Sequence, residues 1–554
     1  MKRIYTFFPI AILLACSMTA GAAERHKHSP ELESLDLESN VDVIIQYKQA
    51  PVERHHSKVT ARGGMLRTHL SLVNGAHYTI PATSLEALAA DPEVLYISPN
   101  NAVWGALDLS AAAVNADQVR DQYNLDGSGI AVAVIDSGFS AHPDVHGSTV
   151  VYQQNFTSEK DSRDNFGHGT HVIGIIAGNA HSSSSNAAKR SLEGISPGVD
   201  ILNLKVLDKN GGGSDSQVIA AIQTAITLKS KYNIRVINLS LGRPVYESYK
   251  LDPLCKAAEA AWKAGIVVVA AAGNSGRDNS LGTGGYGTIM APGNDPYVIT
   301  VGAMKTMDTP SRTDDLVASY SSKGPTAVDH IVKPDLVAPG NRVVSLRSGD
   351  GVMPALYPQN VIDINYYLSG NNGNNPSKTY FKLSGTSMAT PVVSAGAALL
   401  LQKYPSLTPD QVKARLMKTA FKTFPVSSIA IDPVTKASFT SYYDIFTVGA
   451  GYLDLAAAVA SSDVSTLPAT SPSASYDDAT HVVTLITGAN VIWGSNVIWG
   501  SNVVWGSNVV WGSNVVWGSN VIWGSNVVWG SNVVWGATSQ TSSEASAIAI
   551  NGEN

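Results

Sequence analysis

Cysteine is scarce in this chain, whose 554 residues include only Cys16 and Cys255. Cys16 lies in an N-terminal segment that we expect to be removed, which would leave no partner for an intrachain disulfide. The fold must then be stabilised by its hydrophobic core, and the chain is long enough to build a large one. Cys255 falls in a helix-like segment and is predicted to be a small buried hydrophobic residue. Nothing around it supports a catalytic thiol.

An excess of positive charge is also missing. The chain has 38 Lys and Arg against 44 Asp and Glu, a net charge of −6. This balance gives no electrostatic footprint for nucleic acid, so no such partner is expected. No phosphate-binding Walker loop or dinucleotide fingerprint occurs in a strand–helix context. Beyond residue 23, no apolar run is long enough to predict a membrane-spanning helix.

The first 23 residues have the features of a secretory signal peptide. Basic residues occupy positions 2 and 3, residues 4–15 are apolar, and small residues at 20–22 offer a cleavage site. The apolar stretch is too short to span a bilayer comfortably. We therefore expect secretion, to the extracellular space or the periplasm. The alternative is a lipid anchor on Cys16, because residues 13–16 resemble a bacterial lipoprotein signal.

Two candidate catalytic residues lie beside short apolar stretches. Residues 130–135 form a continuous apolar run typical of a strand buried on both faces, and Asp136 ends it. Open α/β sheets place their sites at such strand ends, although a turn or cap aspartate would look the same. His168 lies between two glycines before a run of small apolar residues, which favours a general base. His171 is interpreted as a hydrogen-bonded structural neighbour, because the His-Glu-x-x-His pattern of zinc proteases is absent.

A second pair of candidates follows further along the chain. Residues 266–272 form another apolar strand that leads into Asn274, whose amide can donate to an oxyanion. A plain turn asparagine is the alternative. Ser387 lies in Gly-Thr-Ser-Met-Ala-Thr-Pro, between a glycine turn and an apolar helix. Its hydroxyl is expected to face the free N–H groups of the helix start, which favour negative charge.

In the order Asp136, His168, Asn274, Ser387, these residues and their flanking sequences resemble the subtilisin-like serine proteases, or subtilases. The chain order separates this family from convergent serine proteases with the same geometry. The resemblance covers roughly residues 115–460 and implies an α/β domain of three layers with a mostly parallel central sheet. Three further stretches support it: residues 238–242, 318–325 and 333–340.

The resemblance implies hydrolysis of peptide bonds through an acyl-enzyme. Ser387 would attack the carbonyl, His168 would accept and later return the proton, and Asp136 would orient the imidazole. Asn274 and the Ser387 N–H would bind the oxyanion, and catalysis would need no cofactor. Protein or peptide substrates would pair as an added strand between two segments. A flexible loop is the alternative for the first segment, residues 211–213. These candidate substrate-binding residues are Gly211, Gly212, Gly213, Ser214, Ser240, Leu241 and Gly242.

The sequence departs from the family pattern in two places. Arg243 and Pro244 follow the second substrate-binding segment, where many relatives carry smaller residues, and they are expected to reshape the primary specificity pocket. The loop 179–193 is long and serine-rich in a region where relatives often bind calcium. It shows no clear set of ligands. Asp144 is the one position carried over as a candidate ligand for a structural calcium ion.

Residues 24–106 are predicted to form a separate small α+β unit. Its position between a signal peptide and a subtilase domain resembles the family's propeptide, which acts as a folding chaperone and inhibitor. Self-cleavage is expected near residues 104–114. Six of the 13 histidines precede residue 80. A solvated histidine-rich surface is the favoured interpretation, and the alternative hypothesis is that their protonation at acid pH loosens the inhibitor. A release rate independent of pH between about 5 and 8 would reject this hypothesis. The expected strands are 41–47, 78–80 and 94–97, and the expected helices are 66–73 and 84–90.

The C-terminal part changes in composition after the peptidase domain, which we place at 107–460. Residues 461–489 are predicted to form a linker. Residues 490–536 contain eight copies of Asn-Val-(Ile/Val)-Trp-Gly-Ser, the last without its serine, and no charged residue. The repeats are compatible with a small β-solenoid or with a disordered, self-associating tail, and with expansion without a selected role. The sequence does not identify the partner of the repeats; the candidates are the cell envelope, a polymer and a second copy of the chain. Residues 537–554 form a tail.

The sequence therefore predicts a secreted serine endopeptidase that matures by cleaving its own propeptide. The alternative is a non-enzymatic surface protein that uses a protease-derived scaffold to present the tryptophan repeats. The presence of all four catalytic positions favours the enzyme.

Overall fold

The computed structural model describes residues 27–28, 32, 39–70, 74–99, 106–280, 282–370, 375–432, 435–477, 482–486 and 552–553. The predicted signal peptide and the repeats 490–536 lie outside the described residues. The chain divides into two units, Met1–Val103 and Trp104–Asn554, which are treated separately below. Within the described parts, no helix has the length and apolar character needed to cross a bilayer.

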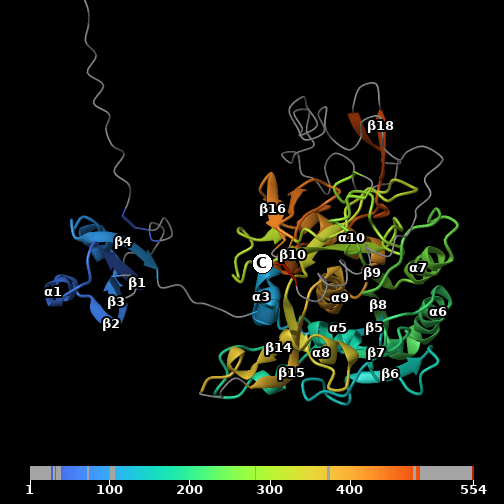
Figure 1. Cartoon of the computed structure of the whole chain (residues 1–554), viewed down its shortest axis with the longest axis horizontal. Coiled ribbons are helices and arrows are strands. Elements are labelled where there is room, and N and C mark those ends of the chain that lie inside the picture. Colours follow the sequence, from blue (N-terminus) through green and yellow to red (C-terminus); the bar gives the residue numbers. More distant parts are fainter. Residues whose placement is uncertain are drawn as a thin grey trace, which may run out of the picture. The chain divides into compact units, whose positions relative to one another are not determined.

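The N-terminal unit is an antiparallel sheet with two short helices (Figure 1). Four strands pair in the order β2-β3-β1-β4, and alternate residues such as Val43 and Ile45 of β1 form its small core. The helix expected over 66–73 was wrong: these residues form strand β2, because they pair with β3. The elements are β1 (Asn40–Tyr47), α1 (Glu53–Thr60), β2 (Met65–Leu70), β3 (Gly75–Pro81), a 3₁₀ turn (Ala82–Ser84), α2 (Leu85–Ala89) and β4 (Val94–Pro99).

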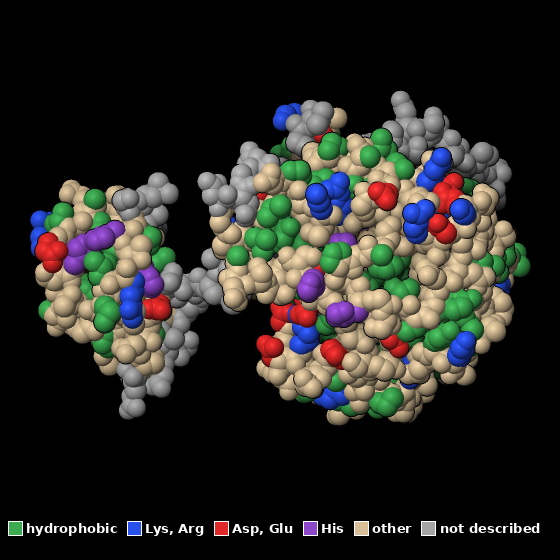
Figure 2. All heavy atoms as spheres, turned by 90° about the horizontal axis from the view of Figure 1, so that it is seen from below, with side chains coloured by type: hydrophobic (Ala, Val, Ile, Leu, Met, Phe, Trp, Pro, Cys, Tyr) green, Lys and Arg blue, Asp and Glu red, His purple; other side chains and the backbone are tan. Residues whose placement is uncertain are grey.

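Histidine side chains gather on the N-terminal unit (Figure 2). The rings of His56 and His69 meet edge to face with centroids 4.8 Å apart, and His56 Nδ1 lies 2.7 Å from the hydroxyl of Tyr78. Burial lowers the pKa of His56, and the neighbouring His69 lowers it further. The folded unit therefore favours neutral His56, and this contribution to stability is lost as pH falls below the ordinary histidine pKa. The direction agrees with the acid-release hypothesis, which stays a prediction.

The second unit is built around an eight-stranded, mostly parallel sheet. The strands run in the order β11-β10-β9-β8-β5-β7-β6, with β12 also paired to β10, and only β11 is antiparallel to its neighbour. The central strands are mostly apolar, as expected for strands whose two faces are both covered, although β7 and β8 also contain polar residues such as Asn203 and Asn238. The strands are β5 (Ala131–Asp136), β6 (Val150–Asn155), β7 (Asp200–Lys205), β8 (Ile234–Leu239), β9 (Val267–Ala271), β10 (Ile299–Lys305), β11 (Leu316–Val317) and β12 (Leu336–Pro339).

Helices cover both faces of this sheet and complete three layers (Figure 1). Helices α5 and α9 pack against each other on one face, and α6 and α7 pack together on the other. The three-layer, mostly parallel α/β architecture expected from the sequence is confirmed. The helices are α3 (Ala106–Ala113), α4 (Ala116–Tyr123), α5 (His168–Ala177), α6 (Asp215–Tyr232), α7 (Pro253–Lys263), α8 (Val352–Leu356), α9 (Thr386–Lys403), α10 (Pro409–Thr419) and α11 (Leu455–Ala460).

The second unit also contains smaller sheets and 3₁₀ turns outside the central sheet. The segment 461–489, expected to be a linker, contains the hairpin β18–β19, which is joined to the domain by a bridge between Ser473 and Ile331. The remaining strands are β13 (Val343–Leu346), β14 (Val361–Asp363), β15 (Pro376–Leu383), β16 (Ser427–Ile431), β17 (Ser438–Tyr442), β18 (Ser473–Asp477) and β19 (Val482–Ile486), and the 3₁₀ turns are His181–Ser183, Pro358–Asn360 and Ile364–Tyr366.

The strand order determines where functional side chains meet. Strands β5, β7, β8 and β9 are parallel neighbours, so their carboxyl ends lie at one edge of the sheet. Asp136 ends β5, Ser240 follows β8, and Asn274 follows β9. This edge is where open α/β sheets place their sites, and it brings residues from distant parts of the sequence together.

Candidate active site

Asp136 is a buried carboxylate, only 1% exposed, at the end of β5. Its Oδ1 accepts hydrogen bonds from the Ser137 backbone N–H at 2.7 Å and from His168 Nδ1 at 2.8 Å. Its Oδ2 is buried and has no hydrogen-bond partner among the described residues. A carboxylate held in this way directs its charge toward the one imidazole that it contacts.

His168 begins helix α5, directly after Gly167, whose φ of 109° requires a residue without a side chain. Because Nδ1–H donates to Asp136, the neutral ring keeps its lone pair on Nε2. Burial alone would lower the pKa of His168, but the charge and hydrogen bond of Asp136 outweigh it and raise the pKa above the ordinary value. The side chain remains 14% exposed, which leaves part of the ring accessible.

Asp164 supports this arrangement and was not identified from the sequence. Its fully buried carboxylate accepts from the backbone N–H of Gly167 at 2.7 Å, the N–H of Thr170 at 2.8 Å and the Ser137 hydroxyl at 2.8 Å. Burial raises the pKa of Asp164. It therefore joins the start of α5 to the turn after β5. Asp164 lies four residues before His168, outside the capping position that Gly167 occupies, so no local sequence pattern identified it.

Asn274 follows β9, and its amide has a defined orientation. Oδ1 accepts from the Thr386 backbone N–H at 2.8 Å and from the Thr386 hydroxyl at 3.1 Å. A backbone N–H can only donate, so the amide oxygen must face Thr386. Nδ2 is left to donate elsewhere, and it makes no hydrogen bond to any described residue.

Ser387 lies in the first turn of α9, after Gly385. Gly385 has φ 140°, a conformation that favours glycine, and a Cβ there would lie 3.1 Å from Asn274 Nδ2, a tight contact that would press on this amide. Ser387 is partly exposed in an otherwise buried helix, and its backbone carbonyl accepts from the Ser240 hydroxyl at 2.8 Å. The structure thus places this serine in contact with the segment that follows β8.

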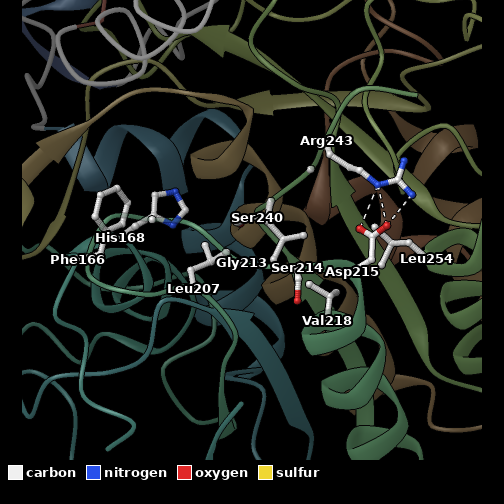
Figure 3. Close-up of a pocket in the computed structure, with 13 residues that line it drawn as sticks. Phe166, His168, Leu207, Gly213, Ser214, Asp215, Val218, Ser240, Arg243 and Leu254 are labelled. Atoms are coloured by element: carbon white, nitrogen blue, oxygen red, sulfur yellow. Dashed lines mark hydrogen bonds and ion pairs between the residues drawn. The ribbon is translucent and has the colours of Figure 1, made fainter. Parts of the chain in front are cut away.

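A cavity of about 330 Å³ opens beside His168 (Figure 3). Six of the seven predicted substrate-binding residues line it; Gly212 does not. Its walls are otherwise mainly apolar, as Figure 3 shows for Phe166, Leu207, Val218 and Leu254. The cavity therefore suits an apolar side chain of a bound molecule. The predicted lining residues are Gly211, Gly213, Ser214, Ser240, Leu241 and Gly242.

The three glycines after β7 have different reasons to be glycine. A Cβ at Gly211 would meet the Phe166 ring at 2.6 Å, and one at Gly213 would meet the Val206 carbonyl at 2.5 Å. Packing within the chain therefore explains both glycines. A Cβ at Gly212 would have only an ordinary contact, 3.6 Å from Asp208 Oδ1. Gly212 is exposed, and the close approach of another backbone explains this glycine better than packing within the chain does.

Arg243 closes one end of the cavity with an ion-pair network (Figure 3). Its Nε lies 3.0 Å from both carboxylate oxygens of Asp215, and Nη2 lies 2.9 Å from Asp252 Oδ1. Asp252 is fully buried and caps the start of α7. The Arg243 side chain is thus fixed in place by two carboxylates.

Two residues assigned structural roles from the sequence have them here. His171 is buried, its Nε2 lies 3.2 Å from the Val343 carbonyl and 3.1 Å from that of Phe381, and burial lowers its pKa to about 3. It is the hydrogen-bonded neighbour that was expected. Cys255 is fully buried, and burial raises the pKa of its thiol.

Asp144, the candidate calcium ligand, is fully buried. One carboxylate oxygen accepts from the backbone and hydroxyl of Ser182, and the other accepts from the Tyr380 hydroxyl. No group of three or more His, Cys, Asp or Glu side chains in the described part of the chain is placed to hold a metal. These surroundings satisfy the carboxylate with protein donors, and a metal role for Asp144 stays a prediction.

Comparison with known proteins places this chain in a family. Residues 127–451 match the sequence model of the Subtilase family. The chain is 36% identical to Serine protease AprX of Bacillus subtilis over 63% of this chain and 75% of that protein. It is 31% identical to Subtilisin E of the same species over 68% of this chain and 84% of that protein. The Thermostable alkaline protease of Halalkalibacterium halodurans is 29% identical over 76% of this chain and 93% of its own length. The chain therefore belongs to the subtilase family and is a subtilisin-like serine protease.

Proposed function

We propose that Ser387, His168 and Asp136 form the catalytic triad of this protease. The observation that carries the assignment is the 2.8 Å hydrogen bond from His168 Nδ1 to the buried Asp136, which leaves Nε2 as the base at the wall of the cavity. Asp136 fixes this tautomer and stabilises the imidazolium that forms during the reaction.

The reaction proceeds in two halves. Ser387 Oγ attacks the peptide carbonyl, and His168 Nε2 accepts its proton and delivers it to the leaving amine as the C–N bond breaks. Water then attacks the acyl-enzyme with the same base, and the serine is released with its proton restored. Asp136 stays ionised throughout, so the net change is hydrolysis of one peptide bond.

We assign the oxyanion hole to Asn274 Nδ2 and the Ser387 backbone N–H. The support is the orientation of the Asn274 amide, whose oxygen is held by Thr386 so that its N–H groups are free to donate. Both donors belong to the region around the start of α9, where the helix dipole also favours negative charge. Donors fixed before the reaction stabilise the transition state without reorganisation.

Peptide substrates would lie between residues 211–214 and 240–242. Both segments line the cavity, and their partly exposed backbones can pair with an extended chain as an added strand. The apolar cavity would receive one substrate side chain. We further propose that the protein is secreted, after removal of residues 1–23.

The N-terminal unit would be the enzyme's own inhibitory propeptide. Proteases bind extended chains, whereas Ala106–Ala113 forms helix α3, in which Ser110 and Ala111 are each 1% exposed. A cut within residues 107–113 would require this helix to unfold. We therefore place the maturation cleavage between Pro99 and Ala106, at the start of the interval 104–114 or just before it.

The test compares the wild type with Ser387→Ala and, as a matched control, with alanine at the exposed Ser427. Intact-mass analysis should show loss of roughly the first 100–106 residues in the wild type and control, and both should digest casein. Ser387→Ala should retain these residues and be inactive. If all three proteins matured identically and none digested casein, the triad assignment would fail and the scaffold alternative would be favoured.

A further inference from the structure

The C-terminal residues Gly552 and Glu553 lie inside the peptidase unit. Glu553 is only 4% exposed, although 65 residues that are not described (487–551) separate this pair from strand β19. Its carboxylate forms an ion pair with Arg277 at 2.5 Å and accepts from the Ser319 backbone N–H at 2.6 Å. A buried carboxylate is costly unless it is paired and hydrogen-bonded, and this one is both.

The pocket around Glu553 is positively charged and buried. The Arg277 side chain is 5% exposed, stacks over Phe439 at 4.5 Å and also pairs with Asp432 at 3.1 Å. Lys305 Nζ lies 3.5 Å from the second carboxylate oxygen of Glu553. The acidic side chain therefore supplies the counter-charge for a cationic site built from β10 and the loop after β9.

The backbone of this pair is bound as specifically as its side chain. Asn341 uses both ends of its amide: Oδ1 accepts from the Glu553 N–H at 3.0 Å, and Nδ2 donates to the Glu553 carbonyl at 2.8 Å. Gly552 has φ 68°, and a Cβ there would lie 2.5 Å from Ser384 Oγ. A side chain at this position would be strained and would have to displace Ser384 and Arg342, so the site favours glycine before Glu553.

The pocket adjoins the turn Ser384–Gly385, which leads into helix α9 and Ser387. Ser384 Oγ, which Gly552 approaches, accepts from the Arg342 backbone N–H at 2.8 Å. The next residue, Gly385, donates from its N–H to the Gly340 carbonyl at 2.8 Å. The bound dipeptide thus packs against the residues that fix the start of α9.

We propose that Gly552–Glu553 is an intramolecular ligand that anchors the C-terminal segment to the peptidase unit. The other flank of this segment is fixed by the hairpin β18–β19, where the Ala474 N–H donates to the His330 carbonyl at 2.8 Å. The tryptophan repeats 490–536 therefore belong to a segment attached at both ends to one domain. Cleavage within the repeats leaves the distal fragment bound.

The first experiment uses the full chain in the inactive Ser387→Ala background. Chymotrypsin cleaves after tryptophan and is used to cut the chain within the repeats, and size-exclusion chromatography with mass spectrometry then follows the fragment that contains Glu553. We expect this fragment to co-elute with the peptidase unit and to separate from it when the chain carries Glu553→Gln. A fragment that separates from the chain with intact Glu553 would overturn the proposal.

The second experiment measures thermal unfolding of the same full chain. Glu553→Gln leaves Arg277 without its closest counter-charge, so its apparent Tm should fall by on the order of 5 °C, whereas the control Glu544→Gln, in the same tail, should change nothing. A synthetic peptide of residues 548–554 should raise the Tm of the Glu553→Gln chain, and the same peptide with glutamine at 553 should not. Equal Tm values for both chains, or equal effects of both peptides, would refute the site. None of these readouts depends on catalysis.

Discussion

Replacement of Asn274 tests the oxyanion assignment most directly, because its two amide atoms have separate tasks. Oδ1 accepts two hydrogen bonds from Thr386, and Nδ2 is assigned to the oxyanion. Asn274→Ala removes both tasks. Asn274→Asp keeps an oxygen toward Thr386 but replaces the donor with a second acceptor that is negatively charged.

The two substitutions should therefore separate stability from catalysis. In subtilisin, loss of one oxyanion donor lowers kcat by about 10²–10³-fold, roughly 2.7–4 kcal/mol, and we expect a similar loss for Asn274→Ala. The two hydrogen bonds to Thr386 contribute about 0.5–1.5 kcal/mol each to folding, so this variant should also be less stable by roughly 1–3 kcal/mol. Asn274→Asp should keep its stability but lose at least as much kcat, because its charge repels the oxyanion.

The assay is steady-state hydrolysis of a chromogenic peptide, combined with thermal denaturation. KM should change little for both variants, since the donor acts mainly in the transition state. If Asn274→Asp retained kcat within about threefold of the wild type, Nδ2 could not be the donor. A kcat loss that simply followed the loss of stability across both variants would equally refute the reasoning.

Two further predictions concern the base and the cavity. Because Asp136 raises the pKa of His168, a pH–rate profile should show kcat/KM rising with pH through an apparent pKa above 6.5. Asp136→Asn should move this rise to lower pH. The same variant should reduce kcat by about 10⁴-fold, as the same change does in another serine protease with this triad. Asp215→Asn leaves Arg243 paired with one carboxylate instead of two. The ratio of kcat/KM for a peptide with an acidic side chain in the cavity to kcat/KM for one with a neutral side chain should then rise by roughly fivefold, about 1 kcal/mol. An unchanged ratio would show that this ion pair does not influence specificity.

The central sheet and its helices could be predicted because their signals are local. The apolar run 130–135 is uniformly buried in β5, and the small-residue run after Ser387 is buried in α9. Local signals failed where pairing decides the outcome. Residues 66–70 form a strand only because β3 lies beside them, and the hairpin Ser473–Ile486 replaces an expected linker. The composition of residues 66–70 or 473–486 does not by itself reveal the strand with which each segment pairs.

The sequence alone determined which residues end the buried strands and start the buried helices, because chain order and residue type are sufficient for that. It could identify Asp136, His168, Asn274 and Ser387 as candidates. Only the tertiary structure decided the distances and orientations among them, such as the 2.8 Å contact of His168 with Asp136. The tertiary structure also decided that Glu553 lies in a buried pocket with Arg277 and Lys305. The first of these contacts joins residues 32 apart in the chain, and the ion pair of Arg277 with Glu553 joins residues 276 apart. Such contacts exist only once parallel strands and packed helices bring those segments together.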